Sequence, residues 1–162
     1  MSKFKDLINN QKNSKSDKKH RFNLEAITIS NRDLTACPCG SSKSFSSCCE
    51  PIHKDIFKAK TPEMLMRSRY SAFTIANIDY LLSSHHSSTR PTKEANEIKE
   101  WATNVKWIKL EVLETNIIDN TEGFVTFKAH FSENNKSEVI FEKSRFVKEN
   151  NHWTYIDGLH NS

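Results

Sequence analysis

A strict alternation of apolar and polar residues runs through the stretch Val125-Thr126-Phe127-Lys128-Ala129-His130-Phe131. Successive side chains of a β-strand point to opposite faces, so this period of two predicts a strand with one apolar face. Three other stretches repeat the pattern, built on Ile108, Leu110 and Val112, on Val139, Phe141, Arg145 and Val147, and on Trp153, Tyr155 and Asp157. Turn-forming pairs at 119–120, 134–135 and 150–151 separate them. The second half of the chain therefore predicts a four-stranded antiparallel meander with short hairpins.

Residues 61–103 have the helical period instead. Thr61 as the cap and Pro62 as the first residue open a predicted helix that runs to residue 75. Asn77 is expected to cap a short second helix, and a third is expected over residues 93–103. Helices followed by a strand meander predict an α+β fold, in which the helices cover one face of a curved sheet.

The composition is ordinary for a globular protein, with 36% hydrophobic and 27% charged residues. Ten Phe and only three Gly indicate an aromatic core and argue against a glycine-rich phosphate loop. No apolar run approaches the roughly 18–20 residues of a membrane-spanning helix. The first ten residues contain no apolar stretch typical of a secretory signal, which predicts a cytoplasmic location without membrane attachment.

Residues 1–35 are polar and basic, with eight Lys or Arg and three acidic residues before residue 33. Such a leader can contact nucleic acid or an acidic partner. It has almost no aromatic side chains to stack on bases, however. We therefore favour a solvated, disordered leader, with nucleic-acid binding as the alternative.

All four cysteines lie within thirteen residues, as Cys37-Pro38-Cys39 and, eight residues later, Cys48-Cys49. Two close pairs joined by a short loop supply the four thiolates that zinc takes at the corners of a tetrahedron. Disulfides between residues that are adjacent or one apart are strained, and they are rare in a reducing compartment. The spacing therefore predicts a metal site, with zinc as the metal.

The segment 37–49 resembles the SEC-C motif, the zinc knuckle at the C-terminus of the SecA translocation ATPase and of many unrelated proteins. Its C-x-C-x(8)-C-[C/H] spacing is met in full. The resemblance implies a structural zinc ion with the ligands Cys37, Cys39, Cys48 and Cys49, and His53 is an alternative to Cys49. The chain departs from the motif in two ways: Ser42 replaces the usual second glycine, and serines replace most of the basic residues between the pairs, with Lys43 remaining.

Four further stretches resemble the YchJ family of bacterial proteins: residues 65–73, 79–81, 144–149 and 153–158. The resemblance covers about residues 36–160. It implies a zinc knuckle over 36–60 and, over 61–160, the nuclear transport factor 2-like (cystatin-like) fold, a cone of helices wrapped on a curved antiparallel sheet. The family has no firmly assigned activity, so the resemblance implies a fold and a metal without a function.

A cone of this kind usually encloses a pocket. Its candidate lining residues are Arg69, Tyr70, Tyr80, His85, Arg145 and Tyr155. Arg145 is in phase with Val139, Phe141 and Val147 and is expected to point inward with them. A buried arginine needs a partner, which Asp157 or Glu63 would supply, and a structural ion pair is favoured over anion recognition.

We expect a zinc-binding protein, not an enzyme, whose knuckle is a structural and protein-interaction module, because four ligands leave no open position for water. The alternative is an enzyme or small-molecule binder that uses the pocket of the cone. A deep pocket with a convergent Arg, His or carboxylate would favour the alternative, and a cone filled by Phe and Trp would favour the module. The sequence predicts no catalytic residue, substrate, partner or oligomeric state.

Overall fold

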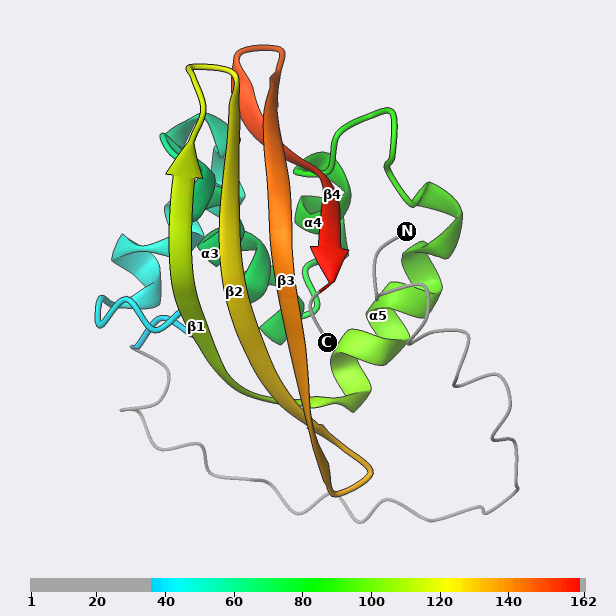
Figure 1. The fold of residues 1–162 in the computed structure, drawn as a ribbon. Coiled ribbons are helices and arrows are strands. Elements are labelled where there is room, and N and C mark those ends of the chain that lie inside the picture. The colour runs from blue at the N-terminus through cyan, green and yellow to red at the C-terminus, as the bar shows by residue number, and fades with distance from the viewer. Residues whose placement is uncertain (1–35, 161–162) are drawn as a thin grey trace.

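The computed structural model describes residues 36–160, which form a helical layer followed in sequence by one sheet (Figure 1). The helical part comprises the 3-10 turns η1 (Phe45–Ser47), η2 (Ile56–Lys58) and η3 (Thr92–Glu94) and the helices α2 (Cys49–Lys54), α3 (Pro62–Thr74), α4 (Ile78–Ser83) and α5 (Ala95–Asn104). The strands are β1 (Lys106–Ile117), β2 (Glu122–Glu133), β3 (Lys136–Glu149) and β4 (His152–His160). The predicted α+β order is confirmed; the predicted leader lies outside the described residues.

The four strands pair in sequence order, β1-β2-β3-β4, each antiparallel to the next. Asn134 and Asn135 join β2 to β3 with φ of 50° and 61°, and Asn150 and Asn151 join β3 to β4 with φ of 50° and 65°. Positive φ at both central residues defines the type I′ turn, whose twist matches that of the strands, and Asn accepts it better than most residues. The predicted meander is confirmed.

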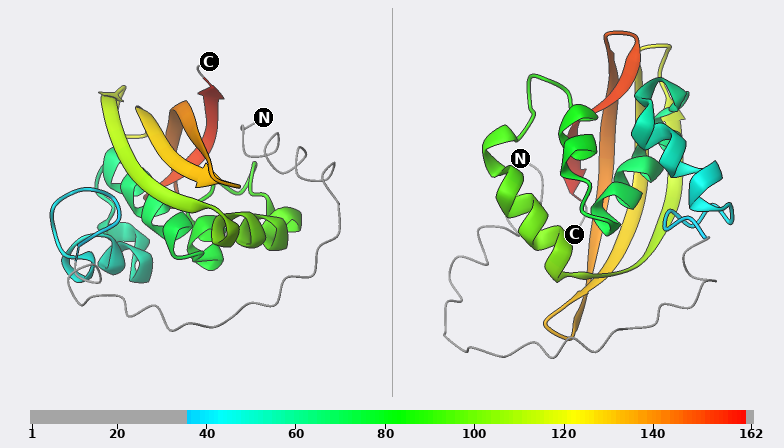
Figure 2. Two further views of the ribbon diagram at one scale, coloured as in Figure 1. Left: turned by 90° about the horizontal axis from the view of Figure 1, so that it is seen from below. Right: turned by 180° about the vertical axis from the view of Figure 1, so that it is seen from behind.

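Helices α3, α4 and α5 cover one face of the sheet (Figure 2). Two helix starts are as predicted: Thr61 Oγ1 accepts from the Met64 N–H, and Asn77 Oδ1 accepts from the Tyr80 N–H, both at 3.1 Å. The third helix begins at Ala95, after η3, slightly later than predicted. Across residues 36–160, no helix combines the length and the apolar character needed to cross a membrane.

Helix α3 ends in a Schellman motif. The Asn77 N–H donates to Ala72 O at 2.8 Å, and the Ala76 N–H donates to Phe73 O at 3.2 Å. Ala76 has a φ of 52°. This left-handed position is most often glycine, because a Cβ there is strained.

The core lies between the helices and the inner face of the sheet. On β2 the predicted apolar face is confirmed, since Val125, Ala129 and Phe131 are at most 3% exposed and Phe127 packs against the core. On β1, a β-bulge between Trp107 and Lys109 changes the phase of the strand. Trp107 therefore joins Leu110 and Val112 in packing on the core, whereas Ile108 is exposed.

The prediction for the inner face of β3 is wrong. Glu142, Ser144 and Phe146 are buried, whereas Val139 is exposed. Phe141 lies on the outer face, where the ammonium of Lys128 lies 5.0 Å from the centre of its ring. Lysine side chains thus cover apolar surface outside the sheet, and polar side chains point inside it.

Candidate metal centre and interior cavity

The four cysteine sulfurs come together at the start of α2. All four Sγ atoms lie within 4.8 Å of one another; Cys48 Sγ is 3.6 Å from Cys39 Sγ and 3.9 Å from Cys49 Sγ. Zinc bound to four thiolates at about 2.3 Å would set the sulfurs about 3.8 Å apart. The separations fit this donor set and are too long for disulfides, and the cysteines are free. The cluster is consistent with zinc binding.

A tight loop brings the two cysteine pairs together. The Cys37 N–H donates to Lys43 O at 2.8 Å, and the Gly40 N–H donates to Cys37 O at 3.2 Å. Gly40 and Ser42 have φ of 75° and 66°. The position at which the SEC-C motif usually has its second glycine therefore has a backbone conformation that glycine adopts without strain.

The thiols interact with one another and with a nearby hydroxyl. Ser41 Oγ lies 3.1 Å from Cys48 Sγ. A hydrogen bond from the Cys49 thiol lowers the pKa of Cys39 to about 4, against the opposing effect of burial. The same hydrogen bond raises the pKa of Cys49. The thiolate, which is the form that binds a metal, is thus favoured at Cys39.

His53 is engaged outside the sulfur cluster. Its Nε2 lies 2.7 Å from Ser68 O, a carbonyl that only accepts, so Nε2 carries the hydrogen. Its ring lies between Phe45 and Tyr80, with ring centres 5.6 Å and 4.5 Å away. Burial lowers the pKa of His53. The geometry thus gives His53 a packing role and includes Cys49, not His53, in the candidate donor set.

Arg67 connects the cysteine loop to α3. Its Nη1 donates to Cys39 O at 2.6 Å, and its Nε donates to Glu63 Oε1 at 3.0 Å, one helical turn away. The Cys37 Sγ also lies 3.6 Å from the Oγ of Ser71, on the same helix. The cysteine loop is therefore held against the helix that lines the cavity described next.

A cavity of about 510 Å³ lies between the helices and the sheet. Four of the six predicted residues line it: Arg69, Tyr70, His85 and Tyr155. Tyr80 is buried outside the lining, where its hydroxyl lies 2.6 Å from Ser68 Oγ. The volume is typical of sites for small molecules.

The sixth predicted residue, Arg145, lies on the outer face of the sheet, so the prediction that it points inward is wrong. Its Nε and Nη2 donate to the Asp157 carboxylate at 3.1 Å and 3.0 Å, and its Nη1 lies 3.4 Å from Glu122 Oε1. The predicted pairing with Asp157 is confirmed. Arg145 shares its face with the apolar residues that the lysines cover, which explains why it follows their phase.

Arg69 is the buried arginine of α3, with 9% of its surface exposed. Its Nη1 donates to Leu81 O at 2.8 Å and to Ser84 Oγ at 2.6 Å. Its guanidinium carbon lies 4.8 Å from the centre of the Tyr155 ring. Burial lowers the pKa of Arg69.

Glu142 is a cavity residue that the sequence reasoning missed. Its Oε1 accepts from the Tyr155 hydroxyl at 2.9 Å and from Ser144 Oγ at 2.8 Å, and its Oε2 lies 3.4 Å from His160 Nδ1. Burial, followed by the charge of Glu142, raises the pKa of Tyr155 well above its usual value. The one sequence signal was Gly158, because a Cβ at this position in β4 would collide with Oε1 of Glu142.

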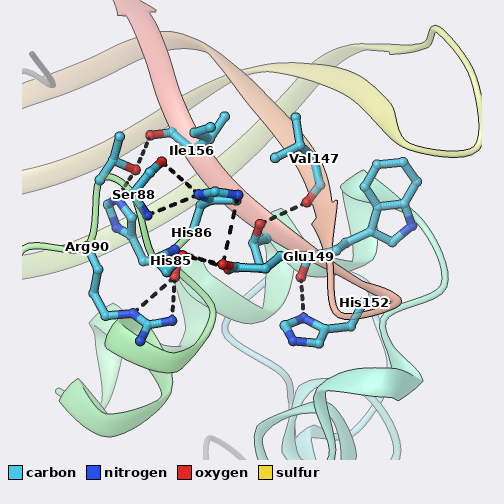
Figure 3. A network of polar contacts seen from close by, with 12 residues as sticks. His85, His86, Ser88, Arg90, Val147, Glu149, His152 and Ile156 are labelled. Carbon is cyan, nitrogen blue, oxygen red and sulfur yellow. Dashed lines mark hydrogen bonds and ion pairs between the residues drawn. The ribbon is translucent and has the colours of Figure 1, made fainter.

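The segment after α4 forms one wall of the cavity by pairing with β4. The His86 N–H donates to Tyr155 O at 2.7 Å, and the Tyr155 N–H donates to Ser84 O at 2.9 Å. Figure 3 shows Arg90 reaching back to the His85 carbonyl, which accepts from its Nε and Nη2 at 3.2 Å and 3.0 Å. These bonds fix the wall that carries His85.

The hydrogen bonds of the Thr89 hydroxyl determine the tautomer of His85. The Thr89 hydroxyl donates to Ile156 O at 2.7 Å, so it accepts from His85 Nε2, 3.1 Å away. Burial, reinforced by the charges of Arg69 and Arg90, lowers the pKa of His85 to about 3. His85 is therefore a neutral imidazole with a hydrogen on Nε2.

The helical layer, the four-stranded sheet and the cysteine cluster define an NTF2-like α+β domain preceded by a cysteine knuckle. The family model described as "YchJ, middle NTF2-like domain" matches residues 61–158. A UPF0225 protein of Vibrio cholerae is 40% identical over 124 residues, covering 76% of this chain and 82% of the relative. One of Vibrio vulnificus is 44% identical over the same length, covering 76% and 74%. The chain belongs to the YchJ family, also named UPF0225.

Two solved structures share the fold. A protein of Rhodopseudomonas palustris superposes with a TM-score of 0.71 at 28% identity, covering 78% of this chain and 99% of the other. One from Psychrobacter arcticus gives a TM-score of 0.68 at 26% identity, covering 80% and 84%. Both are described as SEC-C motif containing proteins. The predicted YchJ and SEC-C resemblances and the NTF2-like fold are confirmed.

Proposed function

We propose that this chain is a zinc-binding protein whose cysteine knuckle is a structural module. The observation that carries the proposal is the cluster of four Sγ atoms within 4.8 Å. Cys37, Cys39, Cys48 and Cys49 would hold the ion, and four thiolates fill its tetrahedral coordination, which is typical of structural sites. Zinc would neutralise the thiolates and hold the loop that Arg67 joins to α3.

Metal analysis tests this proposal. After reducing, chelator-free purification, we expect about one equivalent of zinc per chain by plasma mass spectrometry, and Cys39→Ser should lose it. Ser46→Ala, in the exposed part of the same loop, is the matched control and should keep the metal. Less than about half an equivalent in the unmodified protein would contradict the proposal.

The knuckle is also proposed as a contact site for a protein partner. Its outward side consists of exposed polar residues, Ser42, Lys43, Ser46 and Ser47. A polar rim of this kind suits a transient contact better than a permanent one. We expect the binding of a purified partner protein to this chain to be lost when zinc is removed. Lys43→Glu should weaken the same binding without loss of zinc.

A second function, small-molecule binding by the NTF2-like domain, is favoured by the cavity. Arg69, His85 and Glu142 line one volume of about 510 Å³. The aromatic side chains around it leave this volume open. Convergent polar groups in an open apolar pocket are typical of ligand sites, and this is the feature that distinguishes a binder from a filled cone.

A further inference from the structure

Arg69 lines the cavity, and some of its N–H donors have no acceptor in the described part of the chain. Nη1 uses both of its hydrogens, on Leu81 O and Ser84 Oγ. A guanidinium has five N–H groups, so three remain, on Nε and Nη2. None of these three has an acceptor among residues 36–160. Because Arg69 is only 9% exposed and lines the cavity, these donors can be satisfied only by what occupies the cavity.

The charge of Arg69 is likewise unmatched by a hydrogen-bonded carboxylate within the described chain. Leu81 O and Ser84 Oγ are neutral, and the Tyr155 ring contributes only a cation–π contact at 4.8 Å. The charge of Glu142 acts on Arg69, but Oε1 of Glu142 accepts from Tyr155 and Ser144 and makes no hydrogen bond to the guanidinium. A buried cation without such a partner is unfavourable, and an anion brought to it forms charge-assisted hydrogen bonds.

The charges in the cavity select for one negative charge on a ligand. Two carboxylates, Glu142 and Asp157, line the same volume and repel a second negative charge. The other lining arginine, Arg90, donates Nε and Nη2 to His85 O, and no lysine lines the cavity within residues 36–160. A phosphate dianion needs more positive charge than this, whereas Nε and Nη2 of one arginine match the two oxygens of a carboxylate.

The remaining walls select for an apolar body. Phe73, Trp101 and Trp107 line one part, with the two indole centres 5.3 Å apart and nearly perpendicular. Ile98 and Ile140 add branched aliphatic surface. Flat rings and branched chains bury the most surface against such walls.

We propose that the cavity binds a monocarboxylate with an aromatic or branched aliphatic body, held by Nε and Nη2 of Arg69. The inference rests on the small-molecule binding proposed above and names its ligand class and anchoring residue. A carboxylate there satisfies the unused donors and neutralises the buried charge, and the body fills the aromatic end.

Calorimetric titration of the full-length, zinc-loaded protein tests the inference. The probes are benzoate, 2-naphthoate and 4-methylpentanoate, each with its neutral amide. We expect at least one acid to bind about tenfold or more tightly than its amide, the ratio that hydrogen bonds to a charged group provide. Arg69→Gln should remove this preference. Lys128→Gln, which removes a positive charge from the outer face of the sheet, is the control and should keep it.

Each outcome decides a different question. Binding of acids and amides with equal affinity, or a preference that survives Arg69→Gln, overturns the carboxylate inference and leaves small-molecule binding standing. Binding of none of the six probes overturns both. If Arg69→Gln does not fold, the Nε–H resonance of Arg69 in the unmodified protein decides: it should shift with the acid and not with its amide, and an unchanged resonance overturns the inference.

Discussion

Glu142 keeps its carboxylate inside the molecule because Gly158, beside it on β4, has no side chain. A Cβ on Gly158 would collide with Oε1 and Cδ of Glu142. The carboxylate would then have to leave the hydroxyls of Tyr155 and Ser144. One glycine in a strand interior therefore positions the only carboxylate that is buried among the described residues.

We predict that Gly158→Ala destabilises the protein by about 1–3 kcal/mol, the usual cost of overpacking. Urea unfolding measures the effect. In a Glu142→Ala background the obstruction is gone, so the same substitution should cost much less, and a double-mutant cycle gives the coupling. Equal costs in both backgrounds would show that Glu142 is not the cause.

Among single residues, the sequence predicted those whose role follows from local spacing. The cysteines and the caps Thr61 and Asn77 are of this kind. On β3 the alternation predicts that the apolar residues face the core, which places Arg145 inside and Glu142 outside, the reverse of the structure. That rule fails on a strand that lines a cavity, where inward positions carry polar groups and lysine stems shield apolar residues outside.

At the scale of elements, the C-terminus of α3 has an alanine at the left-handed position of its Schellman motif. We predict that Ala76→Gly stabilises the protein by about 0.5–1 kcal/mol, because relief of strain exceeds the greater freedom of glycine in the unfolded chain. Thermal or urea unfolding measures it.

Asn77→Gly is not a suitable comparison, because Asn77 caps α4. The control is Thr74→Gly, at the last residue of the same helix. It should destabilise the protein, because glycine is a poorer helix former than threonine and the hydrogen bond from Thr74 Oγ1 to Ser71 O is lost. A loss of stability with Ala76→Gly would show that the backbone strain at Ala76 is smaller than the conformational entropy that glycine adds to the unfolded chain.

Strands and turns were predictable because each is encoded within a few residues. The Asn pairs fixed two hairpins, and β2 showed its period along seven residues. The bulges of β1 were not predictable, since an extra residue in a strand depends on its partner across the ladder. The inward turn of Trp107 follows from that pairing and not from its neighbours in sequence.

At the scale of the molecule, His85 connects the helical layer to β4 and stays neutral on burial, with its pKa lowered to about 3. Arg69, Arg90 and His86 face it and disfavour a proton on the ring. The unfolded chain takes up that proton below about pH 6.5. The free energy of unfolding should therefore decrease as the pH falls from about 6.5 towards 3, by up to about 1.4 kcal/mol per pH unit.

Urea unfolding between pH 7.5 and 5 measures this dependence. His85→Gln removes the titrating ring and retains an N–H for Thr89, so its stability should fall less steeply over the same range. The cysteines are identical in both proteins, and the difference between the two slopes therefore reports His85. Parallel slopes would contradict the assignment.

The cavity could be predicted only in part. Four of its residues followed from the fold that the resemblance implied, but its open volume depends on how α3, α5 and the sheet approach one another. That approach is set by many side chains at once, and no local pattern encodes it.

The order of the elements also has a consequence for synthesis on the ribosome. The four cysteines lie within thirteen residues, so a nascent chain can complete the proposed metal site before any strand exists. Helices α3 to α5 come next, with apolar faces that only the sheet will cover. Until β2 and β3 emerge and close their hairpin, the apolar faces of these helices are available to chaperones. A knuckle that had already bound its metal would be folded by then, so the exposed segment would begin only after it.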